Sequence, residues 1–119
     1  MTFKSEVKTA IANSKKAAER HVRGTLLGIY VRTIRRTPVD EGRLRNNWFT
    51  SIGAPTNGIR GLSSGGSGSI GQSNRMVKKI RLGDTIYFTN NLPYAVPIER
   101  GSSTQAPTGM LRISIREAL

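Results

Sequence analysis

The sequence predicts an α+β protein in which a long N-terminal amphipathic helix packs on a small antiparallel sheet and a short helix ends the chain. Three observations predict this class. Apolar residues recur at helical spacing from about residue 3 to residue 36, later segments carry the aromatic and β-branched residues typical of strands, and helical spacing returns after residue 110. With 119 residues and 36% hydrophobic content, one domain over residues 1–119 is expected.

The predicted long helix, from about Phe3 to Arg36, carries two apolar rows. One row runs along the whole helix, and a second lies on another side of its C-terminal half. That half should be covered on two sides, by the protein's own sheet and by a second cover for which a neighbouring subunit is a candidate. Pro38 disfavours a helical residue before it, so the helix should end near Thr37. The first row consists of Val7, Ile11, Ala18, Val22, Thr25 and Ile29, and the second of Leu27, Val31 and Ile34.

Gly24 and Gly28 lie four residues apart beside the second row. Small residues at this spacing let another backbone approach closely, although the pattern is far more informative in membranes than in water. Two interpretations follow: a contact between subunits, or glycines that the helix simply tolerates.

Three segments have the composition of strands. Residues 47–52, which include Trp48, predict a first strand. Residues 77–82 predict a second, and Gly83-Asp84 supplies a turn into a third over residues 86–89, so that the last two form a hairpin. Between the first and second strands, residues from about 53 to 75 are rich in Gly, Ser and Asn, which predicts a flexible loop without packed structure.

The C-terminal part is expected to contain short helices. Residues 93–101 indicate a turn or a short helix closed by Gly101. Residues 110–119 are ambiguous: Leu111, Ile113 and Ile115 alternate as in a strand, whereas Leu111, Ile115 and Leu119 have the spacing of a helix. A helix is favoured because Pro107 can occupy a first turn.

Charge indicates the kind of partner. Nineteen Lys and Arg against seven Asp and Glu give a net charge of +12, which predicts nucleic acid or an acidic protein surface nearby. No motif for reading bases is present, so any contact should be with phosphates, while an equally ordinary interpretation is a solvated face. The candidate contact residues are Lys78, Lys79 and Arg81, followed by Lys16, Arg20 and Arg23 on the helix.

The residues that could carry catalysis or hold a cofactor do not form a site. Gly66 to Gly71 formally matches G-x-G-x-x-G, but we expect neither the strand that should precede it nor the helix that should begin at its end, and no suitably spaced acid follows it. His21 is the only histidine, and the carboxylates have no metal-ligand spacing; Asp40 and Glu41 should hold a turn and pair with Arg43 or Arg45. We therefore expect no enzyme, no cofactor and no metal.

Cysteine is absent, which excludes a disulfide framework and fits a reducing cytoplasm. No apolar run is long enough for a signal segment or a membrane span. A soluble protein is expected.

Two stretches resemble one known family. Residues 37–48, Thr-Pro-Val-Asp-Glu-Gly-Arg-Leu-Arg-Asn-Asn-Trp, resemble the Thr-Pro-Val-Asp-x-Gly-x-Leu-x-x-x-Trp signature of the tail-completion or neck proteins, the minor tail protein Z-like head-tail joining proteins of tailed bacteriophages. Residues 86–95, Ile98-Glu99-x-Gly101 and residues 105–110 are similar to the second half of that family. Glu41 departs from the pattern, because small residues such as Thr are usual at this position. The C-terminus also departs, because it stops before the longer terminal helix expected from the resemblance.

The resemblance implies a structural virion protein that forms a roughly six-fold ring at the head-tail junction, through which genomic DNA passes. Its partners would be further copies of itself, a head connector or adaptor protein, and a tail terminator or tail tube protein. Its location would be the virion, and the host cytoplasm during assembly. The resemblance gives structural roles to Asp40 and Gly42 in the turn, Trp48 in the core, and Tyr94 and Glu99 in a fold or subunit contact.

The alternative function is that of a small basic protein which binds nucleic acid without sequence preference. It would use the same basic helix as a monomer or dimer, so assembly into a closed ring is the observation that separates the two functions.

Overall fold

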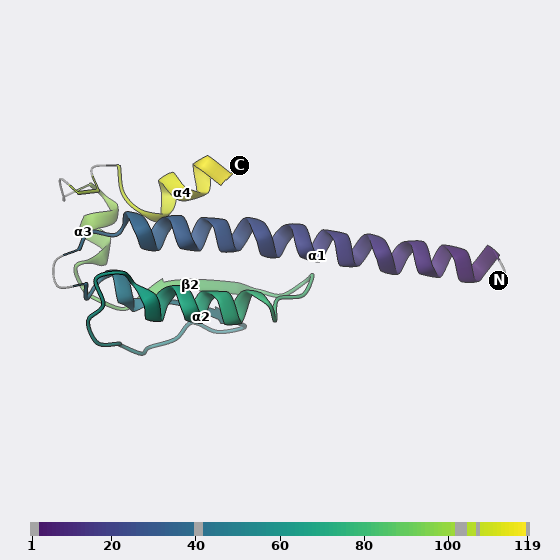
Figure 1. The fold of residues 1–119 in the computed structure, drawn as a ribbon, viewed down its shortest axis with the longest axis horizontal. Helices are drawn as coiled ribbons and strands as arrows, with labels where there is room; N and C mark the ends of the chain where they lie inside the picture. Colours follow the sequence, from purple (N-terminus) through teal and green to yellow (C-terminus); the bar gives the residue numbers. More distant parts are fainter. Residues whose placement is uncertain (1–2, 40–41, 102–104, 107, 119) are drawn as a thin grey trace.

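A computed structural model describes residues 3–39, 42–101, 105–106 and 108–118, and it has the predicted mixture of helix and strand. The long helix α1 (Phe3–Arg36) crosses the whole molecule, and its N-terminal half projects beyond every other described element (Figure 1). The molecule is consequently elongated, at 61 × 26 × 21 Å. The other elements are η1 (Arg45–Asn47), β1 (Trp48–Ile52), α2 (Ser67–Val77), β2 (Ile86–Asn90), α3 (Ala95–Glu99) and α4 (Leu111–Ala118).

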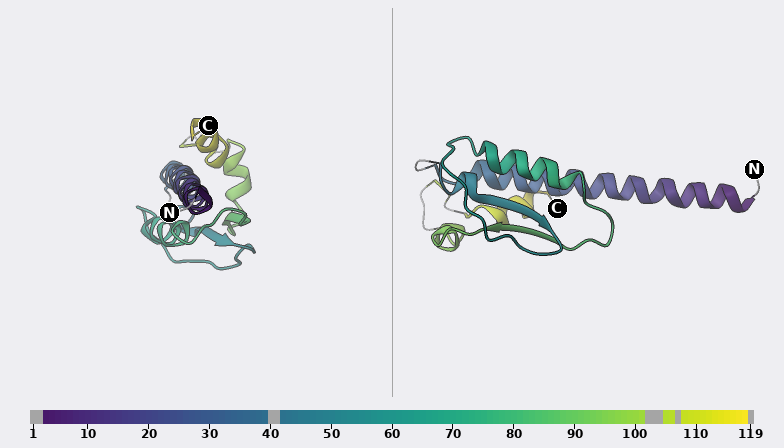
Figure 2. Two further views of the ribbon diagram at one scale, coloured as in Figure 1. Left: turned by 90° about the vertical axis from the view of Figure 1, so that its right-hand side faces the viewer. Right: turned by 90° about the horizontal axis from the view of Figure 1, so that it is seen from below.

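The C-terminal half of α1 is the platform on which the rest of the chain packs. The sheet and α2 lie on one side of it, and α4 lies on another (Figure 2). Arg36 joins α1 to α4 by a hydrogen bond to Ser114 and an ion pair with Glu117. The prediction of two covered sides is therefore confirmed, and in this structure both covers come from the chain itself.

The sheet has two antiparallel strands, β1 and β2, in which Trp48 lies opposite Asn90 and Ile52 lies opposite Ile86. The predicted strand over residues 77–82 is wrong, and so is its hairpin. Val77 ends α2, and Ile80 follows in a turn; both side chains are 3% exposed and pack against Ile29 and Tyr30 of α1. Their spacing of three suits one turn of helix rather than a strand.

The loop predicted over residues 53–75 is wrong in its second part, because α2 begins at Ser67, whereas residues 53–66 form neither helix nor strand. The polar side of α2 satisfies the free edge of β1: Ser69 Oγ accepts from the Trp48 N–H at 2.9 Å. The Gln72 amide accepts from the Thr50 N–H at 2.8 Å and donates to the Thr50 carbonyl at 2.6 Å. Small and polar residues therefore complete a sheet edge whose backbone groups would otherwise lack partners.

The connection before α2 is held by Asn47 and Arg60. Asn47, fully buried, accepts from the Arg60 N–H at 2.6 Å and donates to the Arg43 carbonyl at 2.6 Å. The Arg60 guanidinium donates to the Trp48 carbonyl at 2.9 Å and lies 4.0 Å from the Phe49 ring centroid. Desolvation by burial, followed by repulsion from Arg75, lowers the pKa of Arg60 below its ordinary value.

The turn after α1 is built by Gly42 and Arg45. Gly42 has a φ of +77°, and a Cβ there would lie 2.3 Å from the Ser63 backbone, so only glycine fits. The Arg45 guanidinium donates to the carbonyls of Arg35 and Thr37, each at 2.9 Å, and thus caps the end of α1. The role expected for Arg45, pairing with Asp40 or Glu41, involves two positions that lie outside the described residues.

The core is joined by a stack of three aromatic rings. Phe88 of β2 lies between Tyr30 and Trp48, with ring centroids 4.2 and 4.7 Å away. Trp48, predicted as a core residue, is 5% exposed, and its indole N–H donates to the Thr37 hydroxyl at 2.8 Å. Burial of the Tyr30 hydroxyl raises its pKa to about 12. Phe88 packs against both hydrophobic clusters, so it connects the two halves of the core.

Both short C-terminal helices are confirmed. Gly101, with a φ of +92°, follows α3 as expected, and α4 is a helix rather than a strand. Pro107, which favoured the helix at the sequence level, lies outside the described residues.

Candidate nucleic-acid interface

The structure brings the two predicted groups of basic residues together. The turn that follows α2 is anchored by the buried side chains of Val77 and Ile80, which leaves Lys78, Lys79 and Arg81 exposed beside the middle of α1. We use the term basic interface for Lys78, Lys79 and Arg81 of this turn together with Lys16 and Arg20 of α1.

Arg23 attaches the turn to α1. Its Nε donates to the Ile80 carbonyl at 2.7 Å, and its Nη2 lies 3.5 Å from a carboxylate oxygen of Glu19. Arg23 is therefore half-buried and occupied, and it positions the interface instead of offering a free charge. The spacing of four between Glu19 and Arg23 on a helix is the sequence signal that could have shown this.

Lys16 and Arg20 border a shallow depression of about 400 Å³ that is also lined by Glu19 and Arg23. Glu19 is the one acidic residue lining it, and Arg23 offsets its charge. The five cations of the basic interface are all exposed. Clustered, hydrated cations of this kind attract phosphate groups from any sequence and allow a bound strand to slide, since they make no contact that reads bases.

The glycine pattern from Gly66 to Gly71 has a packing role. Its backbone donors are used within the chain: the N–H groups of Gly68 and Ser69 donate to Asn46 Oδ1 at 2.8 and 3.3 Å, and that of Ile70 donates to the Gly66 carbonyl at 2.9 Å. A Cβ at Gly68 would lie 2.6 Å from Asn46 Oδ1. The N–H groups that would hold a phosphate are thus already occupied.

The residues predicted for subunit contacts lie in different places. A Cβ at Gly24 or Gly28 would meet nothing within 4 Å, so no part of the described chain uses the close approach that these glycines permit. Leu27 packs against the protein's own core, and Val31 is half-buried. Tyr94 is 40% exposed beside α3, and Asp40 lies outside the described residues.

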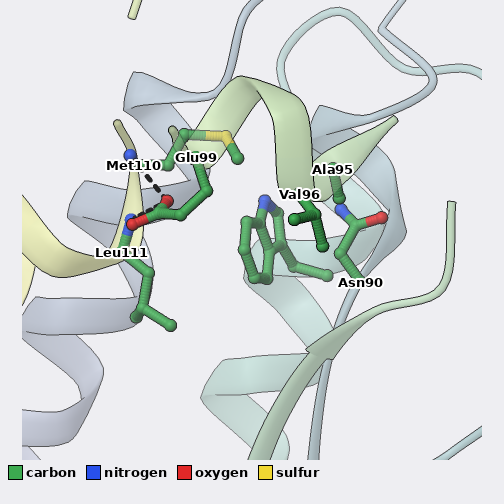
Figure 3. A pocket seen from close by; sticks show the side chains of 7 residues that line it. Asn90, Ala95, Val96, Glu99, Met110 and Leu111 are labelled. Carbon is green, nitrogen blue, oxygen red and sulfur yellow. Dashed lines mark hydrogen bonds between the residues drawn. The ribbon is translucent and has the colours of Figure 1, made fainter. Parts of the chain in front are cut away.

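Glu99 has a clear structural role, which Figure 3 shows. It lies at a small hollow of about 160 Å³ that is mostly lined by apolar side chains, including those of Trp48, Val96 and Met110. Its carboxylate accepts from the backbone N–H groups of Met110, Leu111 and Arg112 at 2.8 to 2.9 Å. These are the first free N–H groups of α4, so Glu99 caps this helix from a distance.

We expect Glu99→Ala to lower the free energy of unfolding by about 2 kcal/mol, because three donors lose a charged acceptor. Urea unfolding followed by the fluorescence of Trp48, the only tryptophan, measures this. Glu6→Ala, an exposed carboxylate in the first turn of α1, is the control and should change little.

The same contact predicts a pH dependence. Desolvation raises the pKa of Glu99, but the hydrogen bonds from the backbone N–H groups of Arg112, Leu111 and Met110 and from the Arg112 side chain lower it by more, so the pKa of this carboxyl lies below its ordinary value. A lowered folded-state pKa contributes stability that is present above the unfolded pKa and lost as pH falls through the folded one. The stability difference between the native chain and Glu99→Gln should therefore shrink below about pH 4.5. A difference independent of pH would contradict the assignment.

Comparison of the chain with protein-family models, with curated proteins and with solved structures finds no match. Among the described residues, no three His, Asp or Glu side chains converge on a point where they could hold a metal ion. Within the same part of the chain, none of the helices is long and apolar enough to span a membrane.

Proposed function

We propose that this chain is a structural subunit of a tailed-phage virion, which forms a ring at the head-tail junction and lets genomic DNA pass through its centre. The class is that of the tail-completion or neck proteins, which residues 37–48, 86–95, 98–101 and 105–110 resemble. No catalytic activity and no cofactor are part of this proposal.

The observation that carries the proposal is the projecting half of α1. Residues 6–18 are all exposed, and the apolar row on this half includes Val7 at 40%, Ile11 at 52% and Val22 at 36% exposure. An isolated helix is marginal in water, and most helical stability in proteins comes from packing an apolar face. A chain that extends such a helix away from its own body is built to be completed by neighbouring molecules.

The motif residues support a structural role because they act in folding. The Thr37 hydroxyl accepts from the Trp48 indole N–H, Gly42 permits the close approach of the Ser63 backbone, and Glu99 caps α4. Each therefore has a purpose in the fold that requires no substrate.

The basic interface supplies the proposed contact with DNA. We place Lys78, Lys79 and Arg81 toward the lumen of the ring, ahead of Lys16 and Arg20. Exposed cations without a base reader attract phosphates loosely, which suits the passage of a genome better than tight binding would.

The test of this function is assembly. In particles of a tailed phage that encodes the chain, averaged electron micrographs should locate it as a closed ring at the head-tail junction, and mass measurement should give about six copies per particle. The partners expected there are a head connector or adaptor on one side and a tail terminator or tail tube protein on the other. Its absence from purified particles would overturn the proposal.

The alternative, a small nonspecific nucleic-acid-binding protein, is favoured by one observation: the basic interface is complete within a single chain. Light scattering on the purified protein with and without duplex DNA separates the two functions. The ring subunit should stay monomeric or weakly associated without its assembly partners, whereas the alternative predicts a stable small species that coats DNA.

A further inference from the structure

The apolar row on the projecting half of α1 continues a surface that the protein already uses. Arg36, which binds Ser114 and Glu117 of α4, lies seven residues after Ile29 and fourteen after Val22. Residues seven apart lie close to the same side of a helix. The side of α1 that packs against α4 is therefore the same side that carries the exposed row in the projecting half.

The geometry of α4 shows what kind of element fits this row. Its C-terminus points along α1 toward the N-terminus of α1, so it packs antiparallel (Figure 1). Beyond α4 the row is free in the described structure. An element that continued this packing would be an antiparallel helix.

The exposed part of the row, from Val7 to Val22, is symmetrical, which favours a second copy of this chain as the occupant. Val7 and Val22 lie equally far from a midpoint between Ser14 and Lys15, and so do Ile11 and Ala18. In an antiparallel pair of two copies, Val7 of one copy would meet Val22 of the other, and Ile11 would meet Ala18. A surface that matches itself in this way forms a two-fold contact.

The free length of the row suits this pairing. In the same register, residues 3–6 of one copy would lie opposite residues 23–26 of the other. The paired stretch would therefore end before Ile29, which belongs to the cluster against which Leu111 and Ala118 of α4 pack.

We propose that two copies of the free protein pair antiparallel through the projecting halves of α1, about a two-fold axis between Ser14 and Lys15. The pairing is weak because the side chains are few and small. It goes beyond the proposed function, since it concerns the protein before assembly. Residues 6–22 carry four basic and two acidic residues, so salt should strengthen the pairing by screening their repulsion.

Cysteine cross-linking tests this register directly, because the chain has no cysteine of its own. Under mild oxidation Ser14→Cys should form a disulfide-linked dimer, since two cysteines beside the axis come within bonding distance. Asn13→Cys, next to it and also exposed but on the other side of the helix, should link far more slowly. Equal rates for the two variants would overturn the proposal.

The direction of pairing has its own test. Val7→Cys should not link to itself but should link to Val22→Cys when the two proteins are mixed. Efficient linking of Val7→Cys to itself would indicate a parallel pair and contradict the proposal. In sedimentation equilibrium, Ile11→Asp should abolish the concentration-dependent dimer while Asn13→Asp, with the same added charge, keeps it. A monomer at all concentrations in the native chain would also reject the inference.

Discussion

Replacing Phe88 by alanine should lower the free energy of unfolding by about 3 kcal/mol. The ring of Phe88 stacks on Tyr30 on one face and on Trp48 on the other. Its removal leaves a cavity at a place where both hydrophobic clusters meet, and neither neighbouring ring can move to fill it without leaving its own cluster.

Chemical denaturation measures this change, and Trp48 is a built-in probe because it lies against the substituted ring. Leu62→Ala is the matched control: Leu62 is 59% exposed, so the loss should stay within about 0.5 kcal/mol. A loss below about 1 kcal/mol for Phe88→Ala would mean that the stack does not join the two clusters energetically.

Charge reversal at both Lys78 and Lys79 should weaken binding to duplex DNA by about tenfold or more, because two phosphate contacts become repulsive. The slope of log affinity against log salt should fall by about two. The fold should stay intact, since both side chains are exposed and the buried anchors of the turn, Val77 and Ile80, remain.

Fluorescence anisotropy with DNA duplexes of unrelated sequence, over a range of salt concentrations, measures the affinity and its slope. Reversal of Arg32 and Arg35, which are also exposed but lie away from the basic interface on α1, makes the same change in net charge. If that control lowered the affinity equally, overall charge and not the basic interface would be responsible. In assembled particles, the Lys78 and Lys79 reversal should reduce DNA retention or infectivity; particles that hold DNA and infect normally would exclude these residues from the lumen.

Local chemistry was enough to predict several elements from the sequence. The length of α1 follows from its apolar periodicity and from Pro38, and β1 follows from its aromatic content around Trp48. The short helix before Gly101 and the final helix follow from spacing and from a glycine that accepts a positive φ. Each of these signals lies within a few residues of the element that it predicts.

The sequence alone did not predict α2 or the pairing of β1 with β2, because both depend on which distant groups satisfy one another. Ser69, Gln72 and Ser73 look like loop residues until the unpaired edge of β1 is placed beside them. Asn46, Asn47 and Arg60 are likewise polar residues whose burial makes sense only with their partners in place.

The sequence by itself determined the class of the fold, the long helix and the excess of positive charge, because composition and periodicity are properties of neighbouring residues. Only the tertiary structure decided where that charge gathers. Arg23 reaches the carbonyl of Ile80, 57 residues away, and so brings Lys78, Lys79 and Arg81 beside Lys16 and Arg20. The physical reason is that a buried or half-buried hydrogen-bonding group must find a partner, and nothing in its immediate sequence says where in the fold that partner will lie.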